Sequence, residues 1–411
     1  MKQNRFFVSL FITLISTLFF AQSVFAAKYT YNISWSVDYS GPYAVLMPVL
    51  QPTSKALFAW WNETKGKELG IELVTKQLDT RYDPSVVASS WPGVLSSVKP
   101  IAHLGLGGPD VAALMKRLPN DKVPMFMSTA TYGFIWLPNM WVFQPRPTYS
   151  HEAIGFLKWF HDKNINGRKL RLGILSSKVS PAYVDIVNGF RNFEKGADWL
   201  KVVGVEWVQM KPVSLVSEIR RLSREKPDFI YIGTNTSHVI AVTKAKKELG
   251  LKIPILSASH NSIQMSAYAA RDMSLMEGNY DSYAVDPGIN LNNAGAKTAL
   301  NYCKKMELKC TWGIISVQFS VQQLLVMRAV ERAAAKVGSE NITGEAVYNA
   351  MYYSPFTEED LLELAPTMTF TKDGPFSTLN LKVKATTVEN GKQIMVTKDW
   401  IPIPNVPKWV K

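Results

Sequence analysis

Hydroxyl, amide and aromatic side chains follow several predicted strands of this sequence. They stand in Asp38-Tyr39-Ser40, Ser128-Thr129-Ala130-Thr131-Tyr132, Ser176-Ser177-Lys178, Gly233-Thr234-Asn235-Thr236 and Ser257-Ala258-Ser259-His260-Asn261-Ser262. Ligands of open α/β sheets bind outside the carboxyl ends of the strands, so these clusters predict a binding site made of hydrogen-bonding groups. Ser, Thr and Asn at such places also cap the next helix, which is the alternative role for part of each cluster.

Motifs of catalysis and of metal binding are missing from the sequence. It has no HExxH, P-loop, G-x-S-x-G or CxxC pattern, and its five His residues lack an acid or Cys at a suitable spacing. Gly105-Leu106-Gly107-Gly108 resembles a dinucleotide-binding loop, but Asp110 replaces the third glycine. The N–H groups of the following helix suit an anion or a polar ligand atom, and an ordinary tight turn is the alternative. We therefore expect no enzyme, no cofactor and no metal site.

The formal net charge of the 411-residue sequence is +13. Its basic residues are spread along predicted helices, as at Lys244, Lys246 and Lys247, and acids such as Glu248 lie among them. A nucleic-acid groove would instead alternate Lys or Arg with aromatic side chains. We therefore expect solvated helix faces and no nucleic-acid partner.

The N-terminus has the pattern of a secretory signal peptide. Lys2 and Arg5 precede an apolar stretch at 6–20, and small or modest residues at 24–26 suit a signal peptidase. A transmembrane anchor is the alternative, but the stretch is short for a span of about 20 residues. We expect cleavage after Ala26, which leaves a charge of +11 because residues 1–26 carry two basic residues and no acid.

Cys303 and Cys310 are the two cysteines of the sequence, and both lie in the exported part. An oxidising compartment would allow a disulfide between them, and two free thiols are the alternative. Two cysteines without a nearby His are too few for a metal site.

Strands and helices alternate in two successive units. The first unit has predicted strands at 29–37, 72–76, 101–106 and 123–127. The second begins after Pro147 and has predicted strands at 170–175, 202–208, 229–232 and 254–256. This alternation predicts parallel sheets covered by helices. From Met368 the pattern changes to Thr-rich strands, and Asn390-Gly391 predicts a hairpin turn.

Several short motifs give the sequence a resemblance to a known family. Residues 39–44, Tyr-Ser-Gly-Pro-Tyr-Ala, look like the family's S/T-G-P-x-A first loop. Residues 62–74 look like its N-x-x-G-G…K-I-E-L-V step, and 79–84 like its D-x-x-Y-D-P motif. Val123-Pro124 and the stretch 370–396 also fit. Over roughly 28–401, the sequence resembles the type I periplasmic substrate-binding proteins of ABC transporters, in the branched-chain amino-acid (Leu/Ile/Val-binding) group.

The resemblance implies an α/β fold of two lobes, with parallel sheets flanked by helices and three hinge crossings. Lobe 1 would comprise 27–146 plus 285–350, and lobe 2 would comprise 147–284 plus 351–411. A small-molecule ligand would bind between the lobes of a monomer in the periplasm and favour a closed form. Membrane permease subunits would then recognise that form.

The family's contacts to the ammonium group of an amino acid do not carry over to this sequence. The first crossing reads Arg146-Pro147-Thr148-Tyr149-Ser150, and Ser259 stands near the place of a second acid. A ligand-binding Ser is replaced within 107–110, whereas Ser128, Thr129 and Thr131 keep a Ser/Thr-rich segment. Burying an ammonium without a carboxylate costs several kcal/mol, so an α-amino acid is not expected.

Aromatic side chains near the expected site suit a flat or hydrophobic organic ligand. Arg146 or Lys178 would hold a carboxylate on it. The predicted ligand-binding residues are Tyr39, Tyr43, Leu46, Gly108, Pro109, Asp110, Ser128, Thr129, Thr131, Tyr149, Lys178, Thr234, Asn235, Ser259, His260 and Tyr280. The alternatives are a branched-chain amino-acid binder with altered contacts, a ligand-sensing periplasmic protein of a signalling system, and an exported enzyme.

Overall fold

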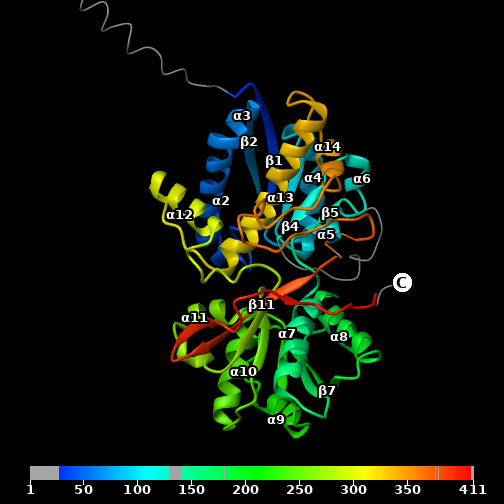
Figure 1. Ribbon diagram of the computed structural model, residues 1–411, viewed down its shortest axis with the longest axis vertical. Helices are drawn as coiled ribbons and strands as arrows, with labels where there is room; N and C mark the ends of the chain where they lie inside the picture. Colours follow the sequence, from blue (N-terminus) through cyan, green and yellow to red (C-terminus); the bar gives the residue numbers. More distant parts are fainter. Residues whose placement is uncertain (1–26, 129–139, 180, 375, 378, 409–411) are drawn as a thin grey trace, which may run out of the picture.

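The computed structural model describes residues 27–128, 140–179, 181–374, 376–377 and 379–408. The signal peptide expected at 1–26 lies outside the described residues, as do Thr129, Thr131 and Tyr132. Two lobes follow one another along the long axis of the molecule, and each contains its own sheet (Figure 1).

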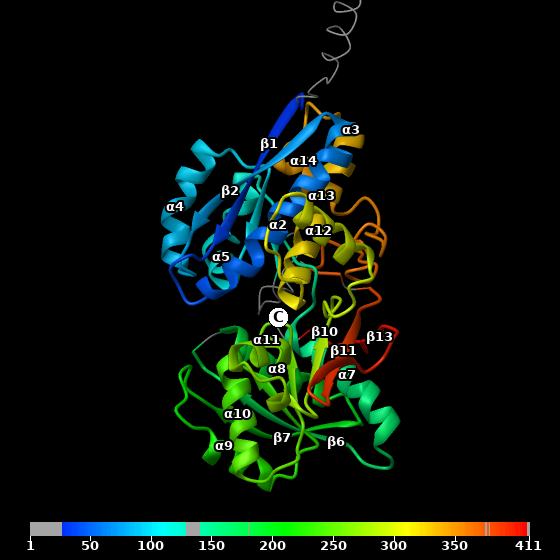
Figure 2. The same ribbon diagram turned by 90° about the vertical axis from the view of Figure 1, so that its left-hand side faces the viewer.

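Lobe 1 is built on a parallel sheet of five strands among the described residues, in the order β2-β1-β3-β4-β5. These strands are β1 (Tyr29–Val37), β2 (Ile71–Asp79), β3 (Ala102–Gly105), β4 (Met125–Met127) and β5 (Val142–Phe143). The early helical segments are η1 (Ala44–Leu46), α2 (Met47–Trp61), η2 (Asn62–Gly66), α3 (Lys67–Leu69), α4 (Pro84–Ser97), α5 (Gly108–Leu114) and α6 (Leu118–Asp121). The chain later returns to lobe 1 as α12 (Ala294–Lys305), α13 (Ile314–Val337) and α14 (Gly344–Ala350). Helix α13 packs against α2, α14 and the sheet, whereas α4 packs against α5 on the other side (Figure 2).

Lobe 2 has its main sheet in the order β12-β11-β10-β9-β8-β6-β7. Its parallel strands are β6 (Leu170–Ser176), β7 (Leu200–Trp207), β8 (Phe229–Gly233), β9 (Ile255–Ala258) and β10 (Tyr280–Tyr283). The antiparallel strands are β11 (Lys382–Glu389), β12 (Lys392–Met395) and β13 (Ile401–Pro402). The helical segments are α7 (Tyr149–Asn164), α8 (Pro181–Glu194), α9 (Val216–Arg224), α10 (Thr236–Glu248), α11 (Ile263–Ala270) and η4 (Ser274–Met276).

The fold class and the hairpin predicted from the sequence are confirmed. Strands β11 and β12 are joined at Asn390 and Gly391, whose φ angles are 53° and 69°. A tight type I′ turn requires positive φ at both central positions, which explains the Asn-Gly pair. The parallel strands of both sheets alternate with helices, as the β–α pattern predicts.

The described chain crosses between the lobes three times. The first crossing joins β5 to α7, the second joins β10 to α12, and the third precedes β11. Phe356, Phe370 and Phe376 are buried in the core of lobe 1. The ring centroids of Phe370 and Phe143 are 5.7 Å apart. This packing puts the third crossing after Phe376, later than the boundary at 350 and 351 expected from the sequence, because these aromatic side chains need the apolar core of lobe 1.

Helix α13 is unusual because it is buried on nearly every side. Its described side chains between 314 and 330 are almost all within the core, whereas a surface helix would keep a polar face. Gln318, Gln322 and Gln323 are among the buried residues and must therefore find partners inside the protein. Among the described residues, no helix is both long and apolar enough to cross a membrane. Ahead of α13, Cys303 and Cys310 form a disulfide.

Candidate functional site

Aromatic side chains from both lobes meet where the lobes face each other. In lobe 1, the ring centroids of Tyr43 and Tyr82 are 4.4 Å apart. In lobe 2, the Tyr149 and His260 rings are 3.9 Å apart, and Tyr183 lies 6.3 Å from His260. The Tyr82 and Tyr183 hydroxyls lie close enough to the Tyr43 hydroxyl to influence its pKa, so the group connects the lobes. We call these residues the aromatic cluster.

The aromatic cluster is uncharged near neutral pH. Burial raises the pKa of the Tyr43 hydroxyl and raises that of Tyr82 well above its usual value. Burial also raises the pKa of Tyr183. For His260, burial and the guanidinium of Arg146 lower the pKa to about 3, against the opposing influence of the Thr234 backbone. The cluster therefore offers neutral hydroxyls and a neutral imidazole.

Buried hydroxyl groups lie at three strand ends. Ser128 follows β4, Thr234 follows β8 and Ser259 follows β9, and all three residues have 0% exposure. Their hydroxyl oxygens have no hydrogen-bond partner in the described part of the chain. Both ring nitrogens of His260 likewise lack a partner of ordinary geometry, although the Thr234 backbone is near. Buried polar groups normally have partners, so these atoms mark where a ligand or water would bind.

Arg146 carries a buried charge close enough to His260 to lower its pKa, and it is paired with Glu152. The Nε and Nη2 atoms of Arg146 donate to the two carboxylate oxygens of Glu152 at 2.7 and 2.9 Å. Nη1 of Arg146 donates to Oε1 of Gln318 in α13 at 2.8 Å. The Glu152 carboxylate also accepts from the backbone N–H of Ala284 at 3.1 Å. Arg146 thus connects the first crossing to the second crossing and to lobe 1. We expected from the sequence that Arg146 would hold a ligand carboxylate, but the structure gives its guanidinium partners within the protein.

The N-terminus of α5 already holds an anion of the protein itself. Oδ2 of Asp110 accepts from the N–H groups of Leu106 and Gly107, each at 3.0 Å. The Tyr82 ring covers this turn, because a Cβ atom at Gly107 would lie only 2.5 Å from the Tyr82 hydroxyl. Gly108 and Pro109 form the first turn of the helix. The expected anion site is therefore filled by Asp110 and covered by Tyr82.

Other predicted site residues lie apart from the aromatic cluster. Tyr39 is 51% exposed and its hydroxyl donates to Gln77 on lobe 1. Leu46 packs against the core of lobe 1, and Tyr280 packs with phenylalanines inside lobe 2.

Lys178 and Asn235 also have partners away from the cluster. The exposed Lys178 Nζ lies 5.5 Å from the centre of the Trp207 ring. Asn235 caps α10 by accepting from the backbone N–H of His238. Tyr43, Tyr149 and His260 are therefore the predicted residues that the structure places in the cluster. Ser128, Thr234 and Ser259 stand at strand ends, and Thr129 and Thr131 are outside the described residues.

Sequence reasoning left Tyr82, Tyr183 and Gln318 out of the predicted site. Tyr82 belongs to the D-x-x-Y-D-P motif, and Tyr183 lies in the first turn of the helix that follows β6. Either position could have been noticed as an aromatic residue beside a strand end. Gln318 is conspicuous as an amide within an apolar helix, and its Nε2 donates to the carbonyl of Ser259 in lobe 2 at 3.1 Å.

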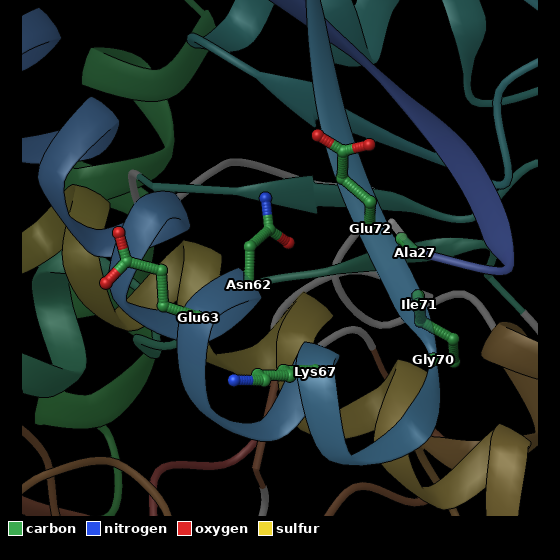
Figure 3. A pocket seen from close by; sticks show the side chains of 7 residues that line it. All are labelled: Ala27, Asn62, Glu63, Lys67, Gly70, Ile71 and Glu72. Atoms are coloured by element: carbon green, nitrogen blue, oxygen red, sulfur yellow. The ribbon is translucent and has the colours of Figure 1, made fainter. Parts of the chain in front are cut away.

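A surface hollow also lies in lobe 1, near the start of the described chain (Figure 3). It is lined by Ala27, Asn62, Glu63, Lys67, Gly70, Ile71 and Glu72. Asn62 bonds the backbone of Leu73, and Glu63 pairs with Lys305, so these side chains serve the packing of lobe 1. A much smaller cavity lies at the crossings beside Arg146 and Ala284. The hollow at the chain start shares no lining residue with the aromatic cluster.

Comparisons with known proteins agree with this arrangement. The family model "Periplasmic binding protein" matches residues 30–391. A search of curated protein sequences found no match.

Among solved structures, an ABC transporter substrate-binding protein of Aeropyrum pernix is similar, with 18% identity, TM-score 0.74 and coverage of 92% of this chain and 97% of that chain. A branched-chain amino-acid ABC transporter protein of Thermus thermophilus with bound valine has 16% identity, the same TM-score and the same coverage. A fatty-acid ABC transporter substrate-binding protein of Thermomonospora curvata has 20% identity, TM-score 0.74 and coverage of 93% and 96%. At such identities the likeness concerns the fold.

Proposed function

Because the chain belongs to the periplasmic binding protein family, a family of binding proteins rather than enzymes, we propose that it is the substrate-binding component of an ABC uptake transporter. It binds a small organic ligand between its lobes and delivers it to membrane permease subunits. The ABC transporter proteins of the same fold from Aeropyrum pernix and Thermomonospora curvata support this proposal.

The ligand is an aromatic or hydrophobic compound rather than an α-amino acid. The observation that carries this proposal is the aromatic cluster, which joins tyrosines of both lobes around His260. An amino acid would need a carboxylate for its ammonium group. The buried carboxylate of Glu152, three residues after Tyr149 in α7, is already bonded to Arg146 and Ala284. Rings stack well on rings, so a flat ligand suits this position.

Ligand binding favours a closed arrangement of the lobes. The described structure has direct contacts between lobes, including Tyr43 with Tyr183 and Gln318 with Ser259. Gln264 of α11 also accepts from the backbone N–H of Ile314 at the start of α13. A ligand that contacts both lobes stabilises the closed state by its differential affinity for that state.

The test is a binding panel with the purified mature protein. We expect thermal shifts and calorimetric heats with aromatic compounds, and none with Leu, Ile or Val. Tyr183→Ala should abolish the signal, whereas Tyr268→Ala, at a surface position that is 75% exposed, should leave it unchanged. Binding of Leu, Ile or Val without any response to aromatic compounds would overturn the proposed ligand class. Mass spectrometry of the exported protein checks the proposed periplasmic export, with an N-terminus at Ala27.

A further inference from the structure

We infer that the aromatic cluster takes an uncharged ligand, a planar molecule whose polar groups are hydroxyl, carbonyl or amide groups rather than a carboxylate or an ammonium. This inference rests on the proposed function, because it assumes that the ligand binds between the lobes at the cluster. It narrows the ligand class, because the sequence alone also allows an organic acid.

The buried charged pair beside the cluster is satisfied within the protein. The Arg146 guanidinium lies 5.4 Å from the centre of the Tyr149 ring, and Glu152 holds it through two hydrogen bonds. Both side chains have 0% exposure, so the pair enters the interface as a neutral unit. Lys178, which would have been the other partner for a carboxylate, lies over Trp207.

The acids on the lobe 1 side are also bound by the protein. Asp38 accepts from the backbone N–H groups of Gly41 and Tyr43. Asp110, which lies close enough to influence Tyr82, accepts from two backbone N–H groups through Oδ2. Its other oxygen has no hydrogen-bond partner among the described residues, but it is buried inside lobe 1, 3.7 Å from Nε2 of His103. An ammonium ligand would therefore find Asp38 bonded to the backbone and Asp110 buried against His103 within lobe 1.

The groups without partners at the strand ends, and those of His260 in the cluster, are neutral. The Ser128, Thr234 and Ser259 hydroxyls each provide one donor and further acceptor positions. His260 is neutral, because burial and Arg146 hold its pKa near 3, so its ring offers one donor and one acceptor. This set satisfies carbonyl, amide and hydroxyl groups. A ligand charge would lose its hydration without gaining a free counter-charge.

The experiment compares three ligands that share one ring. The purified mature protein is titrated calorimetrically at neutral pH with 4-hydroxybenzamide, 4-hydroxybenzoate and 4-hydroxybenzylammonium. We expect the amide to bind at least about tenfold more tightly than either ion, a difference of about 1.4 kcal/mol. Equal or tighter binding of either ion would overturn the inference but leave the proposed aromatic ligand class standing. If none of the three binds and Leu, Ile or Val does, both the inference and the proposed ligand class fail.

A second arm examines the neutral pair itself. In Glu152→Gln, the charge of Arg146 loses its counter-charge, so the affinity ratio of the benzoate to the benzamide should rise about tenfold or more. His260→Phe keeps a ring but removes both nitrogens, so it should weaken benzamide binding while thermal unfolding confirms that the variant is folded. Tyr268→Phe is the matched surface control. An unchanged ratio in folded Glu152→Gln, together with unchanged benzamide binding by His260→Phe, would contradict the inference.

Discussion

Tyr43 connects the two lobes through one hydroxyl group. It lies close enough to the hydroxyls of Tyr82 in its own lobe and Tyr183 in the other lobe to interact with both. Tyr43→Phe removes these polar interactions and keeps the ring. We expect about a fivefold loss of ligand affinity with little change in melting temperature, since a polar interaction of this kind contributes about 1 kcal/mol. Calorimetry measures this loss. Tyr39→Phe, in the same loop but bonded to Gln77, is the matched control and should bind normally.

Arg146 and Glu152 form a fully buried ion pair, which makes each residue dependent on the other. Removing one partner leaves an unpaired buried charge, so Arg146→Met alone should lower the free energy of unfolding by about 3–5 kcal/mol. The double variant Arg146→Met with Glu152→Leu should be less destabilised than either single variant. Urea unfolding of the four proteins gives the coupling. Additive losses would show that the pair is not coupled.

His151 makes the free energy of unfolding depend on pH. Burial lowers the pKa of its imidazole to about 3, below the ordinary value near 6.5. Between pH 6.5 and 3, the imidazole is therefore protonated in the unfolded chain but not in the folded chain. The folded state loses stability as the pH falls through this range. The slope is about 1.4 kcal/mol per pH unit for one histidine. His151→Gln should reduce the measured slope by about that amount.

Asp281 changes the stability with pH in the opposite sense to His151. Burial raises the pKa of its carboxyl to about 7, so the folded chain keeps a proton that the unfolded chain releases above pH 4. Its contribution to stability therefore decreases as the pH rises from 4 towards 7. Asp281→Asn should make the acid-induced loss of stability steeper. A shallower loss in Asp281→Asn would contradict the assignment.

The turn before α5 shows how an element positions a side chain of the site. A Cβ atom at Gly107 would lie 2.5 Å from the Tyr82 ring, so only glycine leaves room for that tyrosine. Gly107→Ala should displace Tyr82 and weaken ligand binding, as calorimetry would show. Gly93→Ala is the matched control, because Gly93 lies exposed in α4 with open space around it. That variant should bind normally and gain up to about 1 kcal/mol of stability.

Helix α13 connects the core of lobe 1 to the interface between the lobes. Its apolar pattern predicts a buried helix, but Gln318 acquires its role only through Arg146, which is 172 residues away in sequence. The position of the third crossing also depends on tertiary packing. The sequence shows that Phe356, Phe370 and Phe376 are hydrophobic, but only the packed core shows that they belong to lobe 1.

At the scale of the whole molecule, the relevant motion is closure of the lobes. Gln264 of lobe 2 contacts the start of α13 in lobe 1 through the Ile314 N–H, a bond available only when the lobes are together. We expect ligand to reduce the radius of gyration in small-angle X-ray scattering. Gln264→Ala should need more ligand for the same compaction, whereas Gln77→Ala, at an exposed position on lobe 1, should behave as the parent. If Gln264→Ala and the parent need the same ligand concentration for compaction, the Gln264–Ile314 contact does not contribute to closure.

The sequence by itself determined the local structure and the fold class. The β–α alternation and Asn390-Gly391 predict parallel sheets and a hairpin, because hydrophobic periodicity and positive φ preferences are local properties. The order of the short motifs was sufficient for the family, which residues 30–391 match. Tyr43, Tyr149 and His260 were also visible as candidates beside strand ends.

Only the tertiary structure decided which side chains meet and which charges remain available. Arg146 has the chemistry of a carboxylate binder in the sequence, but folding places Glu152 and Gln318 against it. Tyr82 and Tyr183 come from different lobes and meet at Tyr43 only after the chain has crossed between them. Partners in a buried network are chosen by topology across long sequence separations, and sequence patterns report only the preferences of neighbouring residues.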